Sequence, residues 1–453
     1  MAQQMTPKMA SLETTDDGNE DNRQQPKIYA KNSMDRFGDD LYGLILSYLS
    51  LEDRFRCECV SKQFQRTVFE SVVDITLSDT FINKILKIKG QLLTRIVIKF
   101  TNIKTIDCRI ISEKYKKRVP EVLQIFRDNC RHLREIYCNL RENSSQTMSS
   151  LLPLITRIGN LCKEFWISGP IINGIDPNSE SQSLIHCHRL SHLNINSLSH
   201  VFHNTSGQIL VNNLTIFELS HYRDKDKELL SAFVAHNQSL KSLTFRTSTK
   251  SQETLNEMSV QLSRLPQLRD LRLGFELYSN ELSVNETLLT IGLNCKQLQR
   301  LTLMSLSCSD YSMQLTLDSL GSYRRLKRLQ LQYINIDINA DPFKHCQRLT
   351  HLELILTPKI AKVLENCHQN CSRLQYLYIY YTEDMIESNR HTYQIDTECL
   401  SHISRLPALQ MLVFQCYGST RFNDNDLNAV LSSSPKLKTI EIRLNNRKKL
   451  FSK

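Results

Sequence analysis

The chain has 453 residues, of which 40% are hydrophobic and 23% are charged, and its formal net charge is +10. This is an ordinary globular composition, and a chain of this length can bury a large core. No run of about 18 consecutive apolar residues occurs, so no transmembrane helix is expected. The N-terminal residues lack the basic start and apolar centre of a secretory signal, which predicts a cytoplasmic or nuclear protein. In such a compartment the 14 cysteines are expected to be reduced thiols.

The N-terminal part of the chain predicts a tail followed by a small helical module. Residues 1–33 are rich in Gln, Asp, Asn and Thr and cannot form a core, so we predict a disordered tail. Apolar residues at helical spacing begin at Phe37 and predict three short helices within residues 34–70. Ser50 and Ser61 are placed to cap the second and third of these helices. A module of this size is marginal alone and should pack against a partner or the rest of the chain.

The rest of the chain repeats a phrase of the form Leu-x-x-Leu-x-Leu. The phrases open at positions 133, 162, 190, 214, 240, 268, 298, 326, 349, 374, 409 and 437, a mean spacing of about 28 residues that is typical of leucine-rich repeats. In x-Leu-x-Leu-x both apolar side chains lie on one face of a short strand and enter the core. We therefore predict that residues 71–445 form an α/β leucine-rich-repeat solenoid of about twelve regular repeats. This fold is a curved horseshoe with parallel strands on its concave face and helices outside.

Several segments around the regular repeats are also predicted. Phrases at residues 72–77 and 93–98 are expected to be irregular first repeats with strands of their own. Helices are expected between phrases, at residues 121–130, 284–293 and 359–365. Residues 446–453 are predicted to form a basic C-terminal tail.

Five cysteines occupy the same repeat position, three residues before an opening Leu: Cys130, Cys187, Cys295, Cys346 and Cys371. Other repeats place large apolar residues there, which predicts a buried packing position. Two clusters could be interpreted as zinc ligands. The first consists of His186, Cys187, His188 and His192, and the second of Cys367, His368 and Cys371. Because each cluster uses a cysteine from the packing position and no Cys-x-x-Cys pair occurs, no metal is expected.

Eleven Lys and Arg residues lie between Lys84 and Arg118, opposed by Asp107 and Glu113. Such a run suggests contact with nucleic acid or an acidic protein. Aromatic residues do not alternate with these charges as single-strand binding requires, so a solvated face is favoured.

Catalytic signatures are missing from the sequence. There is no phosphate-binding glycine loop, no His-Glu-x-x-His and no Gly-x-Ser-x-Gly. The sequence therefore predicts a binding protein without cofactors rather than an enzyme.

The segment that starts at Phe37, FGDDLYGLILSYLSLEDRFRCECVSKQFQ, resembles the F-box motif without insertion or deletion. Gly38, Gly43 and Arg54 depart from the motif, and Phe64 replaces its Trp. Glycine within a helix costs about 0.5–1 kcal/mol relative to alanine. With the repeats, the chain resembles F-box leucine-rich-repeat proteins of the cysteine-containing type.

This resemblance implies the substrate-recognition subunit of a Skp–cullin–F-box (SCF) ubiquitin ligase, itself without catalytic activity. The F-box would dock on a Skp-type adaptor of a cullin–RING ligase, and the repeats would hold an unknown substrate protein. The residues expected to contact the adaptor are Phe37, Leu41, Ile45, Leu46, Leu49, Phe55, Val60 and Phe64.

The alternative is a leucine-rich-repeat scaffold or inhibitor outside any ligase, whose N-terminal helices only cap the repeats. A cap would bury the apolar face of the helical module, whereas an F-box would leave much of this face exposed.

The candidate substrate site is expected on the concave face, where the residues before, between and after the two core positions of each strand point away from the core. Large side chains at these places are expected to bind substrate, and they are Tyr137, Trp166, Arg272, Tyr376, Tyr378, Tyr380 and Val413. Stacked tyrosines could instead simply stabilise neighbouring strands.

Overall fold

The computed structural model describes residues 39–87, 90–116, 118–139, 159–166, 184, 186–202, 206–278, 282–306, 314–338, 341–382, 395–417, 422–445 and 447–453. The predicted disordered tail lies outside these residues. The chain divides into two compact units, Met1–Ser71 and Val72–Lys453. Among the described helices, none has the length and apolar character needed to cross a membrane.

The first unit contains three helices, α1 (Asp39–Ser47), α2 (Leu51–Cys57) and α3 (Lys62–Glu70). The Ser50 hydroxyl accepts a hydrogen bond of 3.2 Å from the backbone N–H of Asp53. The Ser61 hydroxyl accepts one of the same length from the N–H of Phe64. Both serines therefore satisfy backbone donors at a helix N-terminus, as their positions predicted.

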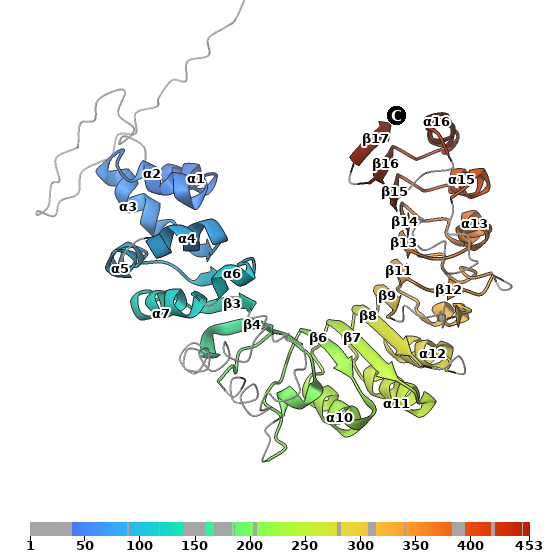
Figure 1. The fold of residues 1–453 in the computed structure, drawn as a ribbon, viewed down its shortest axis with the longest axis horizontal. Coiled ribbons are helices and arrows are strands. Elements are labelled where there is room, and N and C mark those ends of the chain that lie inside the picture. Colours follow the sequence, from blue (N-terminus) through green and yellow to red (C-terminus); the bar gives the residue numbers. More distant parts are fainter. Residues whose placement is uncertain are drawn as a thin grey trace, which may run out of the picture. The chain divides into compact units, whose positions relative to one another are not determined.

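The second unit is built on one sheet, in which neighbouring strands follow the order of the chain (Figure 1). All its strands are parallel except the last, which is antiparallel. The strands are β1 (Asp74–Thr76), β2 (Thr105–Asp107), β3 (Glu135–Asn139), β4 (Cys162–Trp166), β5 (His192–Ile195), β6 (Ile216–Tyr222), β7 (Ser242–Thr249), β8 (Asp270–Leu277), β9 (Arg300–Ser305), β11 (Arg328–Gln332), β13 (His351–Ile355), β14 (Tyr376–Thr382), β15 (Met411–Tyr417), β16 (Thr439–Leu444) and β17 (Arg447–Ser452).

Helices connect most strands of this unit, and those from α10 onward lie along one side of the sheet (Figure 1). The α-helices are α4 (Asp79–Lys87), α5 (Gly90–Ile98), α6 (Glu113–Lys116), α7 (Val119–Asn129), α10 (Lys227–His236), α11 (Gln252–Ser263), α12 (Asn285–Asn294), α13 (Ile360–Leu364), α14 (Cys367–Asn370), α15 (Thr397–Ser404) and α16 (Asp424–Ser433). The 3-10 turns are η2 (Gly159–Leu161), η3 (Leu198–Val201), η4 (Asp224–Asp226) and η5 (Asp318–Ser322). A separate two-stranded sheet pairs β10 (Gln314–Leu315) with β12 (Asn335–Ile336).

The predicted α/β leucine-rich-repeat solenoid is confirmed, because strand and helix alternate along one parallel sheet. Each of the twelve phrases found in the sequence leads into a strand of this sheet. The expected helices at 121–130, 284–293 and 359–365 correspond to α7, α12 and α13.

The core is a column of leucines that runs from strand to strand. Leu271 pairs with Leu301, and Leu301 pairs with Leu329, in the backbone register of β8, β9 and β11. Leu301 and Leu303 are 1% and 0% exposed, as the repeat pattern predicted. Each leucine thus fills the space between its own helix layer and the same residue of the next repeat.

The five cysteines at the shared repeat position are buried, which confirms their packing role. Burial raises the pKa of the Cys130 and Cys295 thiols to about 11. These side chains therefore remain neutral thiols at physiological pH and behave as small apolar groups.

The first repeats differ from the prediction in one place. Residues 72–77 contain β1, as expected, but residues 93–98 belong to helix α5. The missing strand is β2, which lies within the phrase Ile103-x-x-Ile106-x-Cys108, and all three of these side chains are buried. A six-residue apolar pattern fits a helix face as well as a strand, so it could not decide between the two.

The C-terminal residues also differ from the prediction. Residues 447–452 form β17, which pairs antiparallel with β16, instead of a basic tail. This strand covers the edge of β16, whose backbone groups would otherwise be open to pairing with another chain.

The column of leucines makes a direct prediction about stability. Leu301→Ala should lower the free energy of unfolding by about 2–5 kcal/mol, because it leaves a cavity between repeats. Leu293→Ala is the matched control, since Leu293 lies on α12 and is 51% exposed, and it should change stability by less than about 0.5 kcal/mol. Urea unfolding followed by circular dichroism measures both. Equal losses in the two variants would contradict the register.

Candidate protein-interaction surfaces

Helix α1 carries two apolar faces. Tyr42 and Leu46, four residues apart, are buried. The Tyr42 ring meets the Phe64 ring of α3 edge-on, with ring centroids 4.5 Å apart. These side chains form the internal core of the first unit and use only one side of the helix.

The other apolar face of α1 is exposed. It consists of Leu41, Leu44 and Ile45 of α1, and Tyr48 directly after the helix continues their spacing of one helical stripe and is 83% exposed. Val60, in the turn before α3, is 60% exposed. We call these five side chains the α1 surface. An exposed apolar group of this kind is typical of a surface that another protein covers.

The α1 surface revises the list of expected adaptor contacts. Leu41, Ile45 and Val60 are exposed, as that role requires. Leu46 and Phe64 are only 0% and 5% exposed, so both belong to the internal core and not to the exposed face, contrary to what a contact with a partner requires.

Other predicted contacts remain open, because Phe37 and the side chain of Phe55 lie outside the described residues, and Leu49 is half-buried. Leu44 and Tyr48 were missed as site residues, although their spacing of three and seven residues from Leu41 was a usable signal.

One departure from the F-box motif has a structural role. The guanidinium of Arg54 donates hydrogen bonds to the backbone carbonyls of Leu49, at 3.2 Å, and Ser47, at 3.4 Å. It thereby satisfies acceptors at the C-terminal end of α1 that helix geometry leaves unpaired. A Cβ added at Gly43 would meet no other atom within 4 Å, so packing does not require glycine there.

The N-terminal half of the concave face carries a polar network around one buried carboxylate, that of Glu164. Glu164 on β4 is 2% exposed, and its carboxylate accepts a hydrogen bond of 2.8 Å from the guanidinium of Arg109. Arg109 also pairs with Asp107 at 2.6 Å. His192 on β5 lies 3.3 Å from Glu164 and 3.7 Å from Glu218 on β6. A buried carboxylate requires such partners, so the network fixes these strands to one another.

The charge state of His192 depends on these neighbours. Burial disfavours the charged imidazolium, but Glu164 and Glu218 outweigh burial and raise the pKa of His192 to about 9. In return, His192 helps to hold the pKa of Glu218 below its usual value. His192 is therefore a cation at neutral pH.

Tyr137 lies within this network. A register shift in β3 pairs Tyr137 with Glu164, while Trp166 pairs with Asn194. Its hydroxyl donates to Glu135 at 3.0 Å, and Arg109 lies over its ring. Tyr137 is thus already engaged within the repeats.

Two further predicted contacts lie on the concave strands. Arg272 is largely exposed, with its nearest carboxylate, that of Asp270, at 3.8 Å. Trp166 occupies the backbone position expected for it, and its side chain lies outside the described residues.

The C-terminal half of the concave face carries the predicted tyrosines. Tyr376, Tyr378 and Tyr380 on β14 are half-buried, and Tyr417 on β15 meets Tyr380 edge-on at 6.0 Å. The Tyr378 hydroxyl donates to Gln415 at 2.9 Å. Burial raises the pKa of Tyr378 to about 12, so it remains a neutral donor. We call these four residues the tyrosine patch.

Val413 does not belong to the tyrosine patch. It is 0% exposed, and the prediction that it contacts substrate is wrong. Its register partners are Tyr378 on one side and Glu441 on the other. Glu441 is itself held by Arg443 at 2.7 Å and Lys448 at 2.9 Å. The small valine is enclosed by these larger neighbours.

The basic run of residues 84–118 does not form one surface element. It is divided among α4, α5, β2 and α6. Two of its arginines are engaged, because Arg109 pairs with Asp107 and Glu164, and Arg118 pairs with Glu121. Within the part of the chain that the structure describes, no group of three His, Cys, Asp or Glu side chains could hold a metal ion.

Comparison with known proteins identifies the first unit. The sequence model of the F-box domain matches residues 34–73. The chain therefore joins an F-box domain to a leucine-rich-repeat solenoid. No curated protein matches the chain in a sequence search.

Solved structures resemble the chain only weakly. One is the TLR13–ssRNA13 complex, with a TM-score of 0.46 and 15% identity over 77% of this chain and 47% of that one. Another is the Rad7–Elc1 complex of yeast, at 0.39 and 14% over 90% and 93%. A third is LegL7 of Legionella pneumophila, at 0.36 and 12% over 80% and 97%. The chain spans less than half of the first of these, and similarity at this level says nothing about what it binds.

The ion pairs of His192 predict a pH dependence of stability. Its folded pKa of about 9 lies above the unfolded value of about 6.5, so its stabilising effect is complete below pH ~6.5 and lost as pH rises through 9. The difference in unfolding free energy between the native chain and His192→Gln should therefore shrink by up to roughly 3 kcal/mol from about pH 6 to about pH 10.

Urea unfolding across this pH range measures that difference. The control is His188→Gln, an exposed histidine three positions before Ser191, for which no such trend is expected. A difference for His192→Gln that does not change with pH would show that Glu164 and Glu218 do not hold its proton.

Proposed function

We propose that this chain is the substrate-recognition subunit of an SCF-type ubiquitin ligase. It docks on a Skp-type adaptor through the F-box and binds a substrate protein through the repeats. The observation that carries this proposal is the second apolar face of α1, which remains exposed while the first face fills the internal core. The F-box match at residues 34–73 supports the identity of the partner.

The α1 surface has the properties of a protein interface. Its members are large apolar side chains, four of them on α1 or directly after it and one, Val60, in the turn before α3. Covering them removes apolar area from water, which is worth about 25 cal/mol per Å². A few such anchors usually provide most of the binding energy of an interface.

The alternative is a scaffold whose N-terminal helices only cap the repeats. The F-box match at residues 34–73 favours docking on an adaptor, because a cap needs no such motif.

On the concave face, we propose that the tyrosine patch binds substrate, with Arg272 and Trp166 as further contacts. Partly exposed tyrosines bring contact area with little loss of side-chain entropy. The chain itself would be non-catalytic and work without cofactors, with the cullin–RING partners transferring ubiquitin. We propose that it acts in the cytoplasm or nucleus.

Charge placed on the α1 surface should weaken adaptor binding strongly. Val60→Asp puts a carboxylate where an apolar contact is expected, and we predict that the dissociation constant for a Skp-type adaptor rises at least about 30-fold. Co-purification and calorimetry with the purified adaptor measure this change.

The chain offers a closely matched control. Val260→Asp makes the same substitution on α11 of the repeats, where Val260 is 51% exposed, and it should leave adaptor binding unchanged. Both variants should retain the native melting temperature because both sites are exposed. Full adaptor binding by Val60→Asp would refute docking through this surface.

Loss of the tyrosine patch should stabilise substrates. In cells lacking the protein, re-expressed native chain should restore the turnover of its substrates, while Tyr378→Ala should not. Tyr278→Ala is the control, because Tyr278 is 49% exposed but lies outside the patch. Quantitative proteomics measures protein half-lives in all three lines. Normal turnover with Tyr378→Ala would place the substrate elsewhere.

A further inference from the structure

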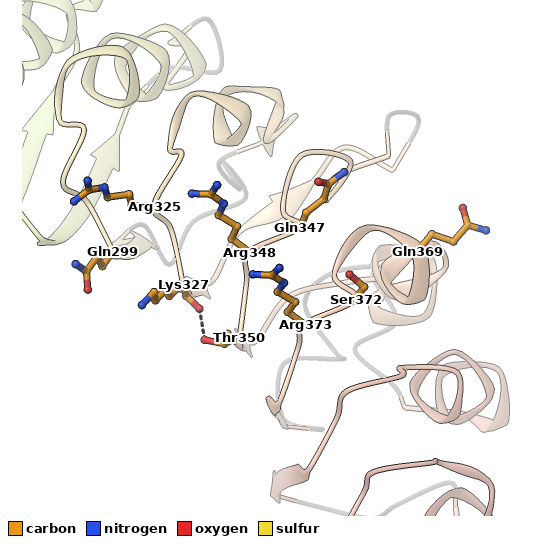
Figure 2. Close-up of a pocket in the computed structure, with 9 residues that line it drawn as sticks. All are labelled: Gln299, Arg325, Lys327, Gln347, Arg348, Thr350, Gln369, Ser372 and Arg373. Atoms are coloured by element: carbon orange, nitrogen blue, oxygen red, sulfur yellow. Dashed lines mark hydrogen bonds between the residues drawn. The ribbon is translucent and has the colours of Figure 1, made fainter.

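A polar pocket with a volume of about 790 Å³ opens on the repeats that contain β11, β13 and β14 (Figure 2). It lies where the chain enters these strands, outside the tyrosine patch. Each of the three repeats contributes an arginine to it, and they are Arg325, Arg348 and Arg373. Figure 2 shows their guanidinium groups extending to the same side.

The regular stacking of the repeats brings these arginines together. Each one directly precedes the opening leucine of its phrase, so all three occupy the same repeat position. Backbone hydrogen bonds of 2.9 Å link the adjoining positions, from the N–H of Lys327 to the carbonyl of Gln299 and from the N–H of Thr350 to the carbonyl of Lys327. Since strands are about 4.8 Å apart, the outer arginines arise roughly 10 Å from each other.

The lining of the pocket is cationic. Lys327 adds a fourth positive charge, and all four cations are exposed. The other lining residues are neutral and polar, and they are Gln299, Gln347, Thr350, Gln369 and Ser372. Among the described residues that line the pocket, none carries a carboxylate, an aromatic ring or an aliphatic side chain.

Within the described residues, no carboxylate pairs with these four positive charges. Arg325 donates to the neutral amide of Gln297, and Arg348 donates to the backbone carbonyl of Arg324 at 2.8 Å. Among the described residues, no ion pair neutralises any of the four cations, whereas Arg109 and Arg443 both pair with carboxylates. Four neighbouring positive charges repel one another, and an anionic ligand would relieve that repulsion.

The chemistry of the lining limits the classes of ligand that the pocket can bind. Arginine forks bind phosphate oxygens in a bidentate manner, and the neutral amides and hydroxyls suit a peptide backbone. A nucleic acid strand is disfavoured because the described lining residues include no aromatic side chain for base stacking. The arginine series is also short, because Gln297 and Ala408 occupy the same position in the flanking repeats.

We propose that this pocket binds a phosphorylated segment of a protein, with two acidic groups, at least one of them a phosphate, about three residues apart. An extended peptide advances about 3.3 Å per residue, so this separation matches the roughly 10 Å between the outer arginines. The proposal rests on the proposed function only in taking the bound protein to be a ligase substrate.

The test is the retention of a peptide library on the immobilised full chain. The library has phosphoserine at two positions three residues apart and random residues elsewhere, and a second library has serine at both positions. We expect the phosphorylated library to be retained at least tenfold more strongly. We also expect its retention to weaken as salt rises.

Substitutions then locate the binding. The double variant Arg348→Gln, Arg373→Gln should lose at least tenfold in retention of the phosphorylated library. Arg189→Gln is the matched control, because Arg189 is exposed and occupies the same repeat position before Leu190, far from the pocket along the chain. It should retain the library like the native chain.

Three results would overturn the proposal. They are equal retention of both libraries, equal loss in the control and the double variant, and displacement of the bound library by single-stranded DNA at a lower concentration than by inorganic tripolyphosphate. The double variant should still bind the Skp-type adaptor. The two readouts separate the two proposals. A chain that binds the adaptor but does not prefer the phosphorylated library refutes the pocket proposal alone, and a chain that prefers this library but does not bind the adaptor refutes the proposed function alone.

Discussion

The stacking of identical strand positions from repeat to repeat is the constraint on which the repeat unit depends. A single phrase of strand and helix cannot bury its own leucines, and they become core only when the next repeat covers them. The register Leu271, Leu301, Leu329 shows this directly, since each leucine lies against its equivalent in the adjacent strand. Parallel pairing fixes that register along the backbone. It therefore also fixes which side chains are left to face away from the core.

The same stacking builds the surfaces on which binding is proposed. It places Tyr378 beside Gln415, and Glu164 beside His192, although these partners are far apart along the chain. Some of the resulting neighbours satisfy one another, as in the buried ion pairs of Glu164. The arginines at positions 325, 348 and 373 do not, since their repeat position supplies no carboxylate. Ligand binding is therefore expected where stacking brings together charged side chains that have no partner of opposite charge.

The F-box unit differs from the repeats, because its small internal core buries only some of the apolar residues of its helices. Tyr42 and Leu46 are buried, and Tyr42 meets Phe64, while Leu44 and Tyr48 remain exposed. A helix with two apolar faces is stabilised when a second partner covers the outer face. This makes the unit suited to docking, and the caps formed by Ser50, Ser61 and Arg54 hold its short helices in place without that partner.

The sequence by itself determined the repeats and the three N-terminal helices, because both depend on local periodicity and capping. Only the tertiary structure decided which apolar face of α1 is internal, since Leu41 and Leu46 are chemically identical and differ only in what packs on them. It also assigned residues 93–98 to a helix, enclosed Val413 between Tyr378 and Glu441, and gathered the pocket arginines. Each of these depends on contacts between residues distant in the chain, which periodicity does not encode.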